Sequence, residues 1–528
     1  MLNRLSFCND HYSSSVGGCK LARFELFLNW EWQSPGGLPG LQNQCRVGKS
    51  RCGFDSHPFP FIMDENKNKS KLLWVLLVCM LIIVNACQPI TPTLTLPPTH
   101  TLTLFPPTAT PLPPNKPTLV VDLNALRGME VKVAYPWVRD QNRVNQLIDD
   151  FNLTNSWGIR AVAESFDSDA LMSEALLHGD LKANVFMGKT FDLLNPQNQV
   201  TLLDLNNHIN DPTWGVLDAY RQNSPFAAIV PKPNEAIPRY SLPLAYDAGL
   251  IYYRTAWAKE LGLAGVPLSW DDFTSQMQAG LRANLNDNLY VNNGTGGLLL
   301  SKSVLSAQSW YAAFGGTYSI ENHVLSLQDN ALDASFRTLK QAFVDDISWV
   351  GLEPTPYQYF VDKYALAYEG TLSELNQQTY YLPEKKTETN WETIPYPTMD
   401  GKGSIALESI SISINAADAE TAQAAWFFVR WMLQPSQQAR LVDITGLWPA
   451  TGHPAVIVED YAALHPAWAS ALKEGVHLTL APEEASWGIN RYILQDAYLR
   501  VYGLESDYFS SIIDVLEQTL AEYPARKP

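Results

Sequence analysis

The stretch YSLPLAYDAGLIYYRTAWAKELGLAGVPLSWDDF, residues 240–273, decides how the rest of the chain is organised. Pro243 has no backbone N–H and biases Leu242 away from helical geometry, so we expect the start of the stretch to be extended. Residues 250–253 form a short apolar and aromatic run that is typical of a strand. The first half of the stretch therefore predicts two extended segments in close succession.

The second half of the stretch predicts two helices. Thr255 is placed to cap a short helix, which Gly262 is placed to end. Ser269 stands three residues before Asp272, which is the spacing of a capping box, and apolar side chains then recur every fourth residue over 273–281. We therefore expect a longer helix to begin at Ser269.

Strand and helix patterns also alternate on both sides of this stretch. Residues 131–135 and 159–163 are strand-like, and residues 144–151 between them carry apolar side chains at helical spacing. A helix at 171–177 precedes a further strand at 184–188. This alternation predicts an α/β protein with a largely parallel sheet.

The order of segments in 240–273 resembles the part of the family 1 extracellular solute-binding proteins of ABC importers that crosses between their two lobes. Further blocks of the chain resemble the same family, which includes the maltose-binding proteins. They are the aromatic run before Gly315-Gly316, the strand that ends at Gly370, and Gly446-Leu447-Trp448-Pro449-Ala450. The resemblance covers nearly all of residues 125–523. It implies a two-lobed periplasmic-binding-protein fold of type II, in which each lobe is a mostly parallel sheet flanked by helices.

The resemblance also implies a division of the folded part and a hinge. Lobe 1 is expected to comprise residues 119–243 and 394–450, and lobe 2 residues 244–393 and 451–528. Pro243 and Leu244 are the expected hinge.

The family resemblance implies that eight residues line the cleft between the lobes. Trp137 and Trp310 would stack on sugar rings from opposite lobes, and the carboxylates of Asp247 and Glu369 would accept hydrogen bonds from hydroxyl groups. For each tryptophan the alternative is core packing. For the two carboxylates the alternatives are structural hydrogen bonds and a glycosidase pair. The predicted substrate-binding residues are Trp137, Tyr246, Asp247, Trp310, Glu369, Ser409, Trp448 and Trp487.

The N-terminal part predicts export and lipid anchoring. Lysines followed by an apolar run at 72–84 make residues 63–86 resemble a signal peptide that ends in a lipobox, with Cys87 as the lipidated residue. A short retained membrane anchor is the alternative. Residues 1–62 do not fit this scheme, and a mis-assigned translation start is our interpretation. Residues 87–118 comprise the lipidated Cys87 and a Pro/Thr-rich stretch that predicts an extended stalk.

Composition narrows the classes of partner and chemistry. The formal net charge of −17 disfavours nucleic acid as a partner. No cysteine follows Cys87, so the folded part has neither a disulfide nor a cysteine metal site. The sequence carries no Walker loop, Gly-x-Ser-x-Gly or His-Glu-x-x-His motif, and its nine histidines are scattered. We therefore expect no catalytic residues, cofactor or metal.

These observations predict a monomeric, lipid-anchored extracytoplasmic binding protein that delivers a small solute to the permease of an ABC importer. A sugar or oligosaccharide is the expected solute, although relatives also bind glycerol phosphates, polyamines and metals. The alternative is a secreted carbohydrate-active enzyme. A pure adhesion or scaffold module would account for the stalk but not for the two-lobe pattern.

Overall fold

The structure is a computed structural model of the 528-residue chain. It describes residues 119–120, 122–195, 201–216, 226, 238–321, 324–351, 356–375, 390–415, 418–451, 458–503 and 508–522. The chain divides into two units, 1–108 and 109–528, and every described residue belongs to the second. The predicted signal peptide, Cys87 and the predicted stalk lie outside the described residues.

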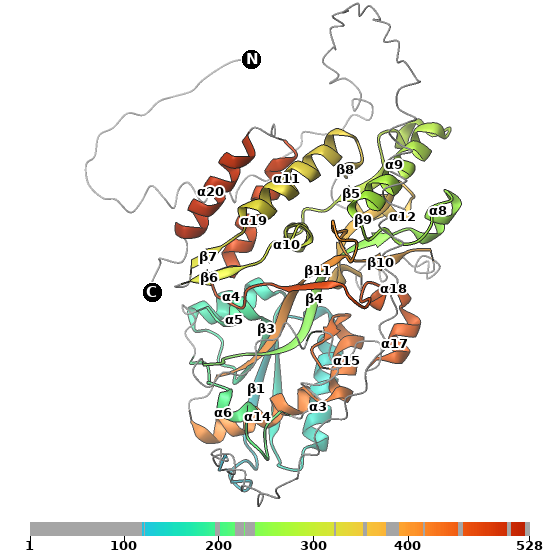
Figure 1. The fold of residues 1–528 in the computed structure, drawn as a ribbon. Coiled ribbons are helices and arrows are strands. Elements are labelled where there is room, and N and C mark those ends of the chain that lie inside the picture. The colour runs from blue at the N-terminus through green and yellow to red at the C-terminus, as the bar shows by residue number, and fades with distance from the viewer. Residues whose placement is uncertain are drawn as a thin grey trace, which may run out of the picture. The chain divides into compact units, whose positions relative to one another are not determined.

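One mixed sheet of eleven strands runs through the described part of the chain (Figure 1). Its strand order is β2-β1-β3-β11-β4-β9-β5-β8, with β10 and β12 also paired to β4 and β13 paired to β11. The strands are β1 (Glu130–Tyr135), β2 (Arg160–Ser165), β3 (Val185–Lys189), β4 (Leu242–Tyr253), β5 (Gly296–Leu300), β8 (Ser348–Val350), β9 (Ala365–Thr371), β10 (Glu392–Ile394), β11 (Ser404–Ile414), β12 (Trp448–Pro449) and β13 (His477–Leu480), and β6 (Ser319–Glu321) and β7 (Val324–Ser326) form a separate hairpin.

The sheet is parallel at its two ends and antiparallel where the long strands β4 and β11 meet their neighbours. β1 pairs in parallel with β2 and β3, and β5 pairs in parallel with β8 and β9. β11 is antiparallel to both β3 and β4, and β4 is antiparallel to β9. The expectation of a largely parallel sheet is therefore right for the outer strands and wrong for the middle, because β4 and β11 cross between the two ends in opposite directions.

Strand β4 is one continuous element, where the sequence predicted two extended pieces. All of its twelve residues are buried, because each edge of the strand pairs with another strand and its faces are covered. Its pairing with β11 is irregular between Ile410 and Ser411, opposite Ala245 and Pro243. The predicted hinge residues Pro243 and Leu244 thus lie in β4, at the point where its register shifts.

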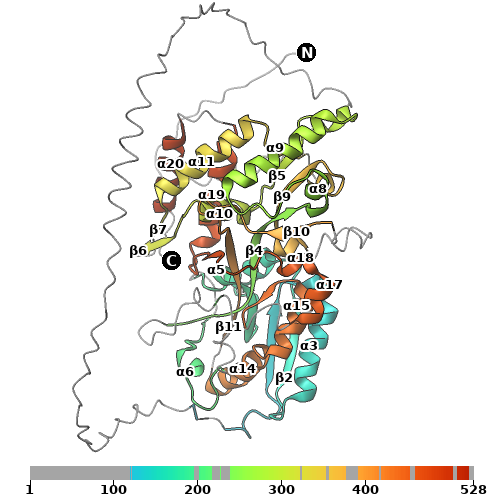
Figure 2. The ribbon, with the colours of Figure 1, turned by 45° about the vertical axis from the view of Figure 1, so that its right-hand side comes forward.

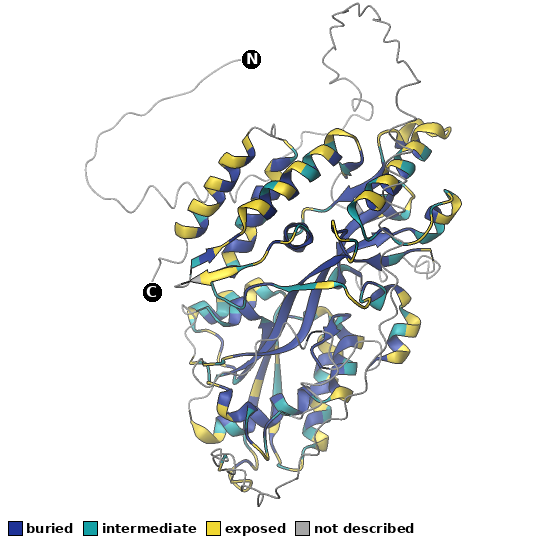
Figure 3. Ribbon diagram, viewed as in Figure 1, coloured by how far each residue is buried: buried dark blue, intermediate teal, exposed yellow. Residues whose placement is uncertain are grey.

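Two large apolar cores lie on either side of the crossing strands. The core of lobe 1 packs strands β1–β3 against helices α3 (Gln141–Thr154) and α14 (Ala419–Met432). The core of lobe 2 packs α9 (Trp270–Asn286), α10 (Val304–Ala313), α11 (Asp329–Val344), α19 (Trp487–Val501) and α20 (Phe509–Glu522) around β5. Figure 2 shows α9, α11 and α20 gathered at one end and α3 and β2 at the other. Figure 3 shows that the crossing strands are the most continuously buried segment.

Further helices complete both lobes. They are η1 (Val138–Asp140), α4 (Asp169–His178), α5 (Thr190–Leu193), α6 (Asn206–Ile209), α8 (Thr255–Glu260), η2 (Tyr290–Asn292), α12 (Pro356–Val361), α15 (Pro435–Thr445), α17 (Glu459–Leu464) and α18 (Pro466–Ala469). A third core, which includes Tyr246, Trp448 and Trp468, lies where β4, β12 and α18 meet. The exact residue division between the lobes stays a prediction.

The helix starts in the deciding stretch follow local chemistry. Ser269 caps α9, because its Oγ accepts a hydrogen bond from the backbone N–H of Asp272 at 3.1 Å. The prediction for the shorter helix is wrong by one residue. Arg254 is the N-cap of α8 and Thr255 is its first helical residue, and no side chain caps this end.

Candidate functional site

A buried carboxylate joins side chains from both lobes. Glu408 lies in β11, directly opposite Asp247 in β4, and its side chain is 2% exposed. Lys189 at the end of β3 places Nζ 3.3 Å from Glu408 Oε2, and Arg491 in α19 places Nη1 at 3.3 Å from the same oxygen. Gln308 in α10 donates a hydrogen bond from Nε2 to Glu408 Oε1 at 2.8 Å. One carboxylate is thus held by two cations and an amide.

Glu408 and the cations around it stabilise each other's charged forms. Burial by itself would raise the pKa of Glu408, but the nearby Lys189 and Arg491, together with the hydrogen bond from Gln308, hold that pKa below its ordinary value. Burial opposes the charge of Lys189, and the attraction of Glu408 more than offsets it, so the pKa of Lys189 is raised. The carboxylate is therefore ionised at neutral pH and Lys189 is protonated.

Two further carboxylates, Asp169 and Asp192, face the same cations. Burial is the largest effect on both: it raises the pKa of Asp192 to about 6 and also raises that of Asp169, while Lys189 and Arg491 lower both pKa values. Asp169 Oδ1 is buried and has no hydrogen-bond partner among the described residues. These groups gain protons more readily than ordinary carboxylates do.

Several neutral polar atoms beside this group are buried and lack a hydrogen-bond partner in the described part of the chain. They are Gln308 Oε1, both side-chain polar atoms of Asn490, and Nε1 of Trp487. Gln308, Asn490 and Trp487 are fully buried. Leaving such an atom unpaired costs about 1–3 kcal/mol, so a polar ligand group that reaches it would be bound favourably. The set mixes donors and acceptors, which a hydroxyl group satisfies because it both donates and accepts.

The first turn of α19 supplies most of these atoms. Trp487, Asn490 and Arg491 stand at positions i, i+3 and i+4, so they share one face of the helix. That face meets α5 of lobe 1: the Arg491 guanidinium lies 4.2 Å from the centroid of the Phe191 ring. The Trp487 ring packs edge-on against Tyr318, with the ring centroids 5.0 Å apart. The site therefore lies where the two lobes touch.

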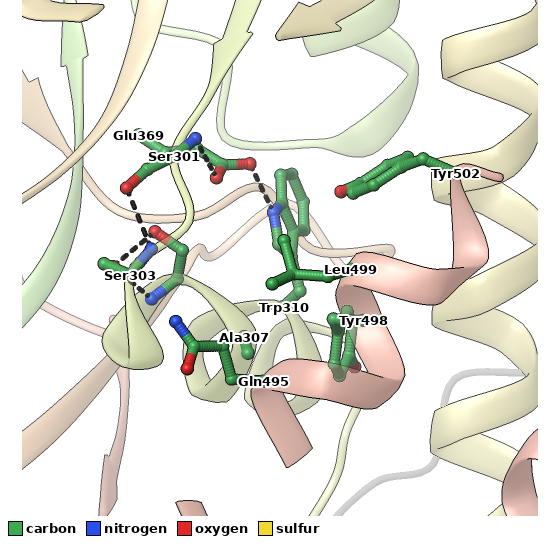
Figure 4. A pocket seen from close by; sticks show the side chains of 10 residues that line it. Ser301, Ser303, Ala307, Trp310, Glu369, Gln495, Tyr498, Leu499 and Tyr502 are labelled. Atoms are coloured by element: carbon green, nitrogen blue, oxygen red, sulfur yellow. Dashed lines mark hydrogen bonds between the residues drawn. The ribbon is translucent and has the colours of Figure 1, made fainter. Parts of the chain in front are cut away.

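A separate small pocket lies inside lobe 2 (Figure 4). Glu369 of β9 forms part of its wall, and its Oε1 accepts the indole N–H of Trp310 at 2.7 Å while its Oε2 accepts the backbone N–H of Ser301 at 2.9 Å. The volume open to water-sized groups is about 10 Å³, which is room for about one water molecule. Burial raises the pKa of Glu369 to about 7 against the effect of these two donors.

Comparison with known proteins decides the family. The model of the bacterial extracellular solute-binding protein family matches residues 146–458, which is more than half of the chain. The chain belongs to this family. No curated protein sequence matches the chain significantly.

Solved structures agree on the fold of this solute-binding protein. The cyclic α-maltosyl-1,6-maltose binding protein of Arthrobacter globiformis aligns with a TM-score of 0.60 at 15% identity, over 76% of this chain and 100% of the other. The sugar-binding protein MalE of Xanthomonas citri aligns with a TM-score of 0.57 at 18% identity, over 75% of this chain and 98% of the other. The MalE domain of Bdellovibrio bacteriovorus bound to maltotriose aligns with a TM-score of 0.53 at 14% identity, over 75% of this chain and 100% of the other. The predicted two-lobed type II fold is confirmed.

Four of the predicted binding residues come together at the crossing strands. Tyr246 pairs with Ser409 of β11 on one side and with Trp448 of β12 on the other, and Asp247 faces Glu408. Ser409 Oγ lies 2.6 Å from Thr190 Oγ1, within hydrogen-bonding distance. Trp448 is fully buried and donates its indole N–H to the carbonyl oxygen of Trp468 at 3.0 Å. Its surroundings favour a structural role, and ligand contact by these residues stays a prediction.

The other four predicted residues lie in three different places. Trp310 and Glu369 bind each other in the lobe 2 pocket, and the indole of Trp310 is 1% exposed. Trp137 is half-buried just after β1 and stacks on Tyr135, with the ring centroids 6.1 Å apart. Trp487 alone of these four supplies one of the unpartnered polar atoms described above.

Sequence reasoning missed Glu408, Arg491, Gln308 and Asn490. Two signals were present. Glu408 is the single charge in the strand SIALESISISI, and Arg491 follows Trp487 at helical i, i+4 spacing. Lys189 directly follows the strand predicted at 184–188, and no role was predicted for it. The role of Glu408 was missed because its partners Lys189 and Arg491 are 219 and 83 residues away in sequence.

The described residues show neither a membrane helix nor a metal centre. No helix among them combines the length and the apolar character needed to cross a bilayer. No group of three or more His, Cys, Asp or Glu side chains within the same residues is arranged to hold a metal ion.

Proposed function

We propose that this solute-binding protein captures a sugar or oligosaccharide between its lobes and delivers it to the permease of an ABC importer. The observation that carries the proposal is the set of buried, unpartnered donors and acceptors on α10 and α19. A polyhydroxylated ligand satisfies such a set, whereas an apolar ligand leaves it unpaired. The similar solved structures include proteins described as binding cyclic α-maltosyl-1,6-maltose and maltotriose.

Binding at this place would couple ligand capture to lobe closure. The site takes Lys189 from lobe 1, Glu408 from a crossing strand and Arg491 from lobe 2. A ligand that contacts both lobes favours the closed arrangement by its difference in affinity for the closed and open forms. Rotation would be absorbed in β4 near Pro243 and Leu244, where the register shifts.

The direct test is a thermal-shift screen of the full chain against maltose, maltotriose, other sugars and polyols. A ligand at about 100 times its Kd adds about 2.7 kcal/mol to the free energy of unfolding. Calorimetry on the best compound should show one site, and Asn490→Leu should weaken binding because it removes one donor and one acceptor. The control is Asn155→Leu in lobe 1, whose amide bonds to backbone at the end of α3. No stabilisation by any sugar or polyol would contradict the proposal.

A secreted carbohydrate-active enzyme is the second candidate. The observation in its favour is that burial raises the pKa values of Glu369 and Glu374 to about 7, which a general acid would need. The enzyme and the binding protein differ in whether they cleave the sugar that they bind. Release of reducing sugar from oligosaccharides would support the enzyme, and stoichiometric binding without release supports the binding protein.

Anchoring and export belong to the same proposal. Cys87 would carry the lipid and residues 88–118 would space the folded part from the membrane, with the binding protein acting as a monomer outside the cytoplasm. Cys87→Ser should then leave uncleaved precursor that lacks lipid. Processing and detergent-phase partitioning like those of the wild type would contradict the anchor.

A further inference from the structure

The two cations that hold Glu408 form a ready-made anion site. The Arg491 guanidinium lies 4.2 Å and the Lys189 ammonium 5.8 Å from the centroid of the same Phe191 ring. Phe191 therefore helps to place both positive groups independently of Glu408. Arg491 Nη1 reaches both carboxylate oxygens of Glu408, at 3.4 and 3.3 Å. The protein's own carboxylate thus occupies the position between the cations.

Glu408 differs from its neighbouring carboxylates in charge state. Burial raises the pKa values of Asp169, Asp192 and Asp247, whereas the pKa of Glu408 is lowered. Asp247 Oδ1 is occupied by the backbone N–H groups of Ala248 and Ser373, at 2.9 and 3.0 Å. Glu408 is therefore the most firmly ionised carboxylate among the described groups of the site.

This arrangement decides which ligands the site can accept. We propose that Glu408 is a specificity-determining residue, whose carboxylate fills the anion site of Lys189 and Arg491 and so restricts the cleft to uncharged ligands. The inference rests on the proposed function, since it names the class of solute that the same cleft takes. An anionic solute such as a uronate or a phosphorylated sugar would have to displace a buried, paired carboxylate, and it would leave that carboxylate without a partner.

Removing the carboxylate should open the anion site. Glu408→Ala leaves Lys189 and Arg491 beside a space of the size of the lost carboxylate, and a small exogenous carboxylate should enter it. Asp169 and Asp192 oppose such an anion while they are ionised. Because burial raises the pKa of Asp192 to about 6, anion binding should strengthen as the pH falls from 8 to 5.5.

The experiment measures the melting temperature of the full chain with sodium formate or inorganic phosphate, against sodium chloride at equal ionic strength. Wild type should respond to formate and phosphate as it does to chloride. Glu408→Ala should show an additional, saturable rise of several degrees with formate, larger at pH 5.5 than at pH 8. Glu408→Ser also frees the space of the carboxylate and should gain the same formate response, which makes the test independent of how well Glu408→Ala folds.

Two controls separate this site from general salt effects. Lys189→Met in the Glu408→Ala background should abolish the formate response. Glu260→Ala removes an exposed carboxylate that is 3.0 Å from Lys363, and it should show no formate response. A formate or phosphate response in wild type, or none beyond chloride in either Glu408 variant, would overturn the inference.

A final comparison distinguishes this inference from the proposed function. If no sugar binds the wild type but formate stabilises Glu408→Ala, the sugar proposal fails and the anion site stands. If glucose or an oligosaccharide binds and neither Glu408 variant responds to anions, the sugar proposal stands and the specificity role fails. Where glucose binds, glucuronate should bind wild type at least about tenfold more weakly, and Glu408→Ser should narrow that ratio.

Discussion

Trp310 donates its indole N–H to Glu369 at 2.7 Å, and each of the two side chains is only 1% exposed. Both residues were predicted from sequence to contact a ligand. In the structure each satisfies the other, and the indole also packs edge-on against Tyr396 with the ring centroids 4.8 Å apart. The pair therefore has a structural role in lobe 2 whatever its part in binding.

Trp310→Ala should lower the free energy of unfolding of the ligand-free protein by about 3–5 kcal/mol. The change removes a buried indole and leaves Glu369 Oε1 without its donor. Denaturant titration measures the loss, and calorimetry with a bound sugar measures any change in affinity. An unchanged stability together with lost affinity would show that Trp310 stacks on ligand, as the sequence predicted.

Glu369 should make the protein less stable as the pH rises. Its pKa is about 7 in the folded state and 4.5 ordinarily, so the folded state holds the proton more tightly than the unfolded state does. The resulting stabilisation is complete below about pH 4.5 and is lost as the pH rises through 7, with a total of about 3 kcal/mol.

The measurement is denaturant titration of wild type and Glu369→Gln between pH 5 and 8. The variant should show the smaller fall in stability across this range, whatever its absolute stability. Since burial also raises the pKa of Glu374 to about 7, part of the fall should remain in the variant. Parallel curves for the two proteins would refute the assignment to Glu369.

Trp137→Ala should weaken sugar binding by about tenfold or more and cost little stability. Trp137 follows the carboxyl end of β1 and is half-buried, so one part of the ring is open to a ligand. Trp157 is the matched control, since it is also half-buried in lobe 1 but precedes β2 and packs on Phe427, with the ring centroids 4.2 Å apart. Trp157→Ala should reduce stability and leave the affinity unchanged. Equal affinity losses in both variants would remove the argument for Trp137.

Local signals sufficed for elements whose ends depend on nearby residues. Ser269 and Asp272 are three residues apart, and the cap they predict is present. Strand β4 was predicted as two pieces because Asp247, Ala248 and Gly249 interrupt the apolar pattern. It is continuous because β11 pairs with Asp247 and β9 with Gly249, and no local pattern encodes those partners.

The candidate site was predictable only in outline for the same reason. The resemblance predicted that Asp247, Ser409 and Trp487 line the cleft, and the structure adds which charges meet beside Asp247. Glu408 acquires its role from Lys189 and Arg491, which reach it from β3 and α19. Whether a tryptophan packs in a core or faces a cleft depends on tertiary burial, so Trp310 and Trp448 could not be separated from Trp137 by sequence.

Ser269→Ala should destabilise the protein by about 1 kcal/mol. The substitution removes the oxygen that accepts the Asp272 backbone N–H at the start of α9. Ser275→Ala is the control, because Ser275 is exposed in the same helix and has no capping role. Chemical denaturation of both variants is the measurement. A similar loss in both variants would show that the cap contributes nothing specific.

Arg491→Met should shift the protein toward an open arrangement of its lobes. Arg491 contacts Glu408 on the crossing strand and Phe191 in lobe 1, so its loss removes a link between lobes and leaves Glu408 with Lys189 as its one described ion-pair partner. Because breaking a buried ion pair typically costs about 3–5 kcal/mol, a change of tenfold or more in the closing equilibrium is expected.

The folded part has no cysteine after Cys87, so spin labels can be placed at exposed Leu153 in α3 and Val344 in α11. Pulsed electron-spin distance measurements should show longer or broader separations in Arg491→Met than in wild type. Arg500→Met is the matched control, since Arg500 pairs with Asp496 within the same helix on its exposed side. It should leave the distances unchanged, and identical distance distributions in all three proteins would show that Arg491 does not hold the lobes together.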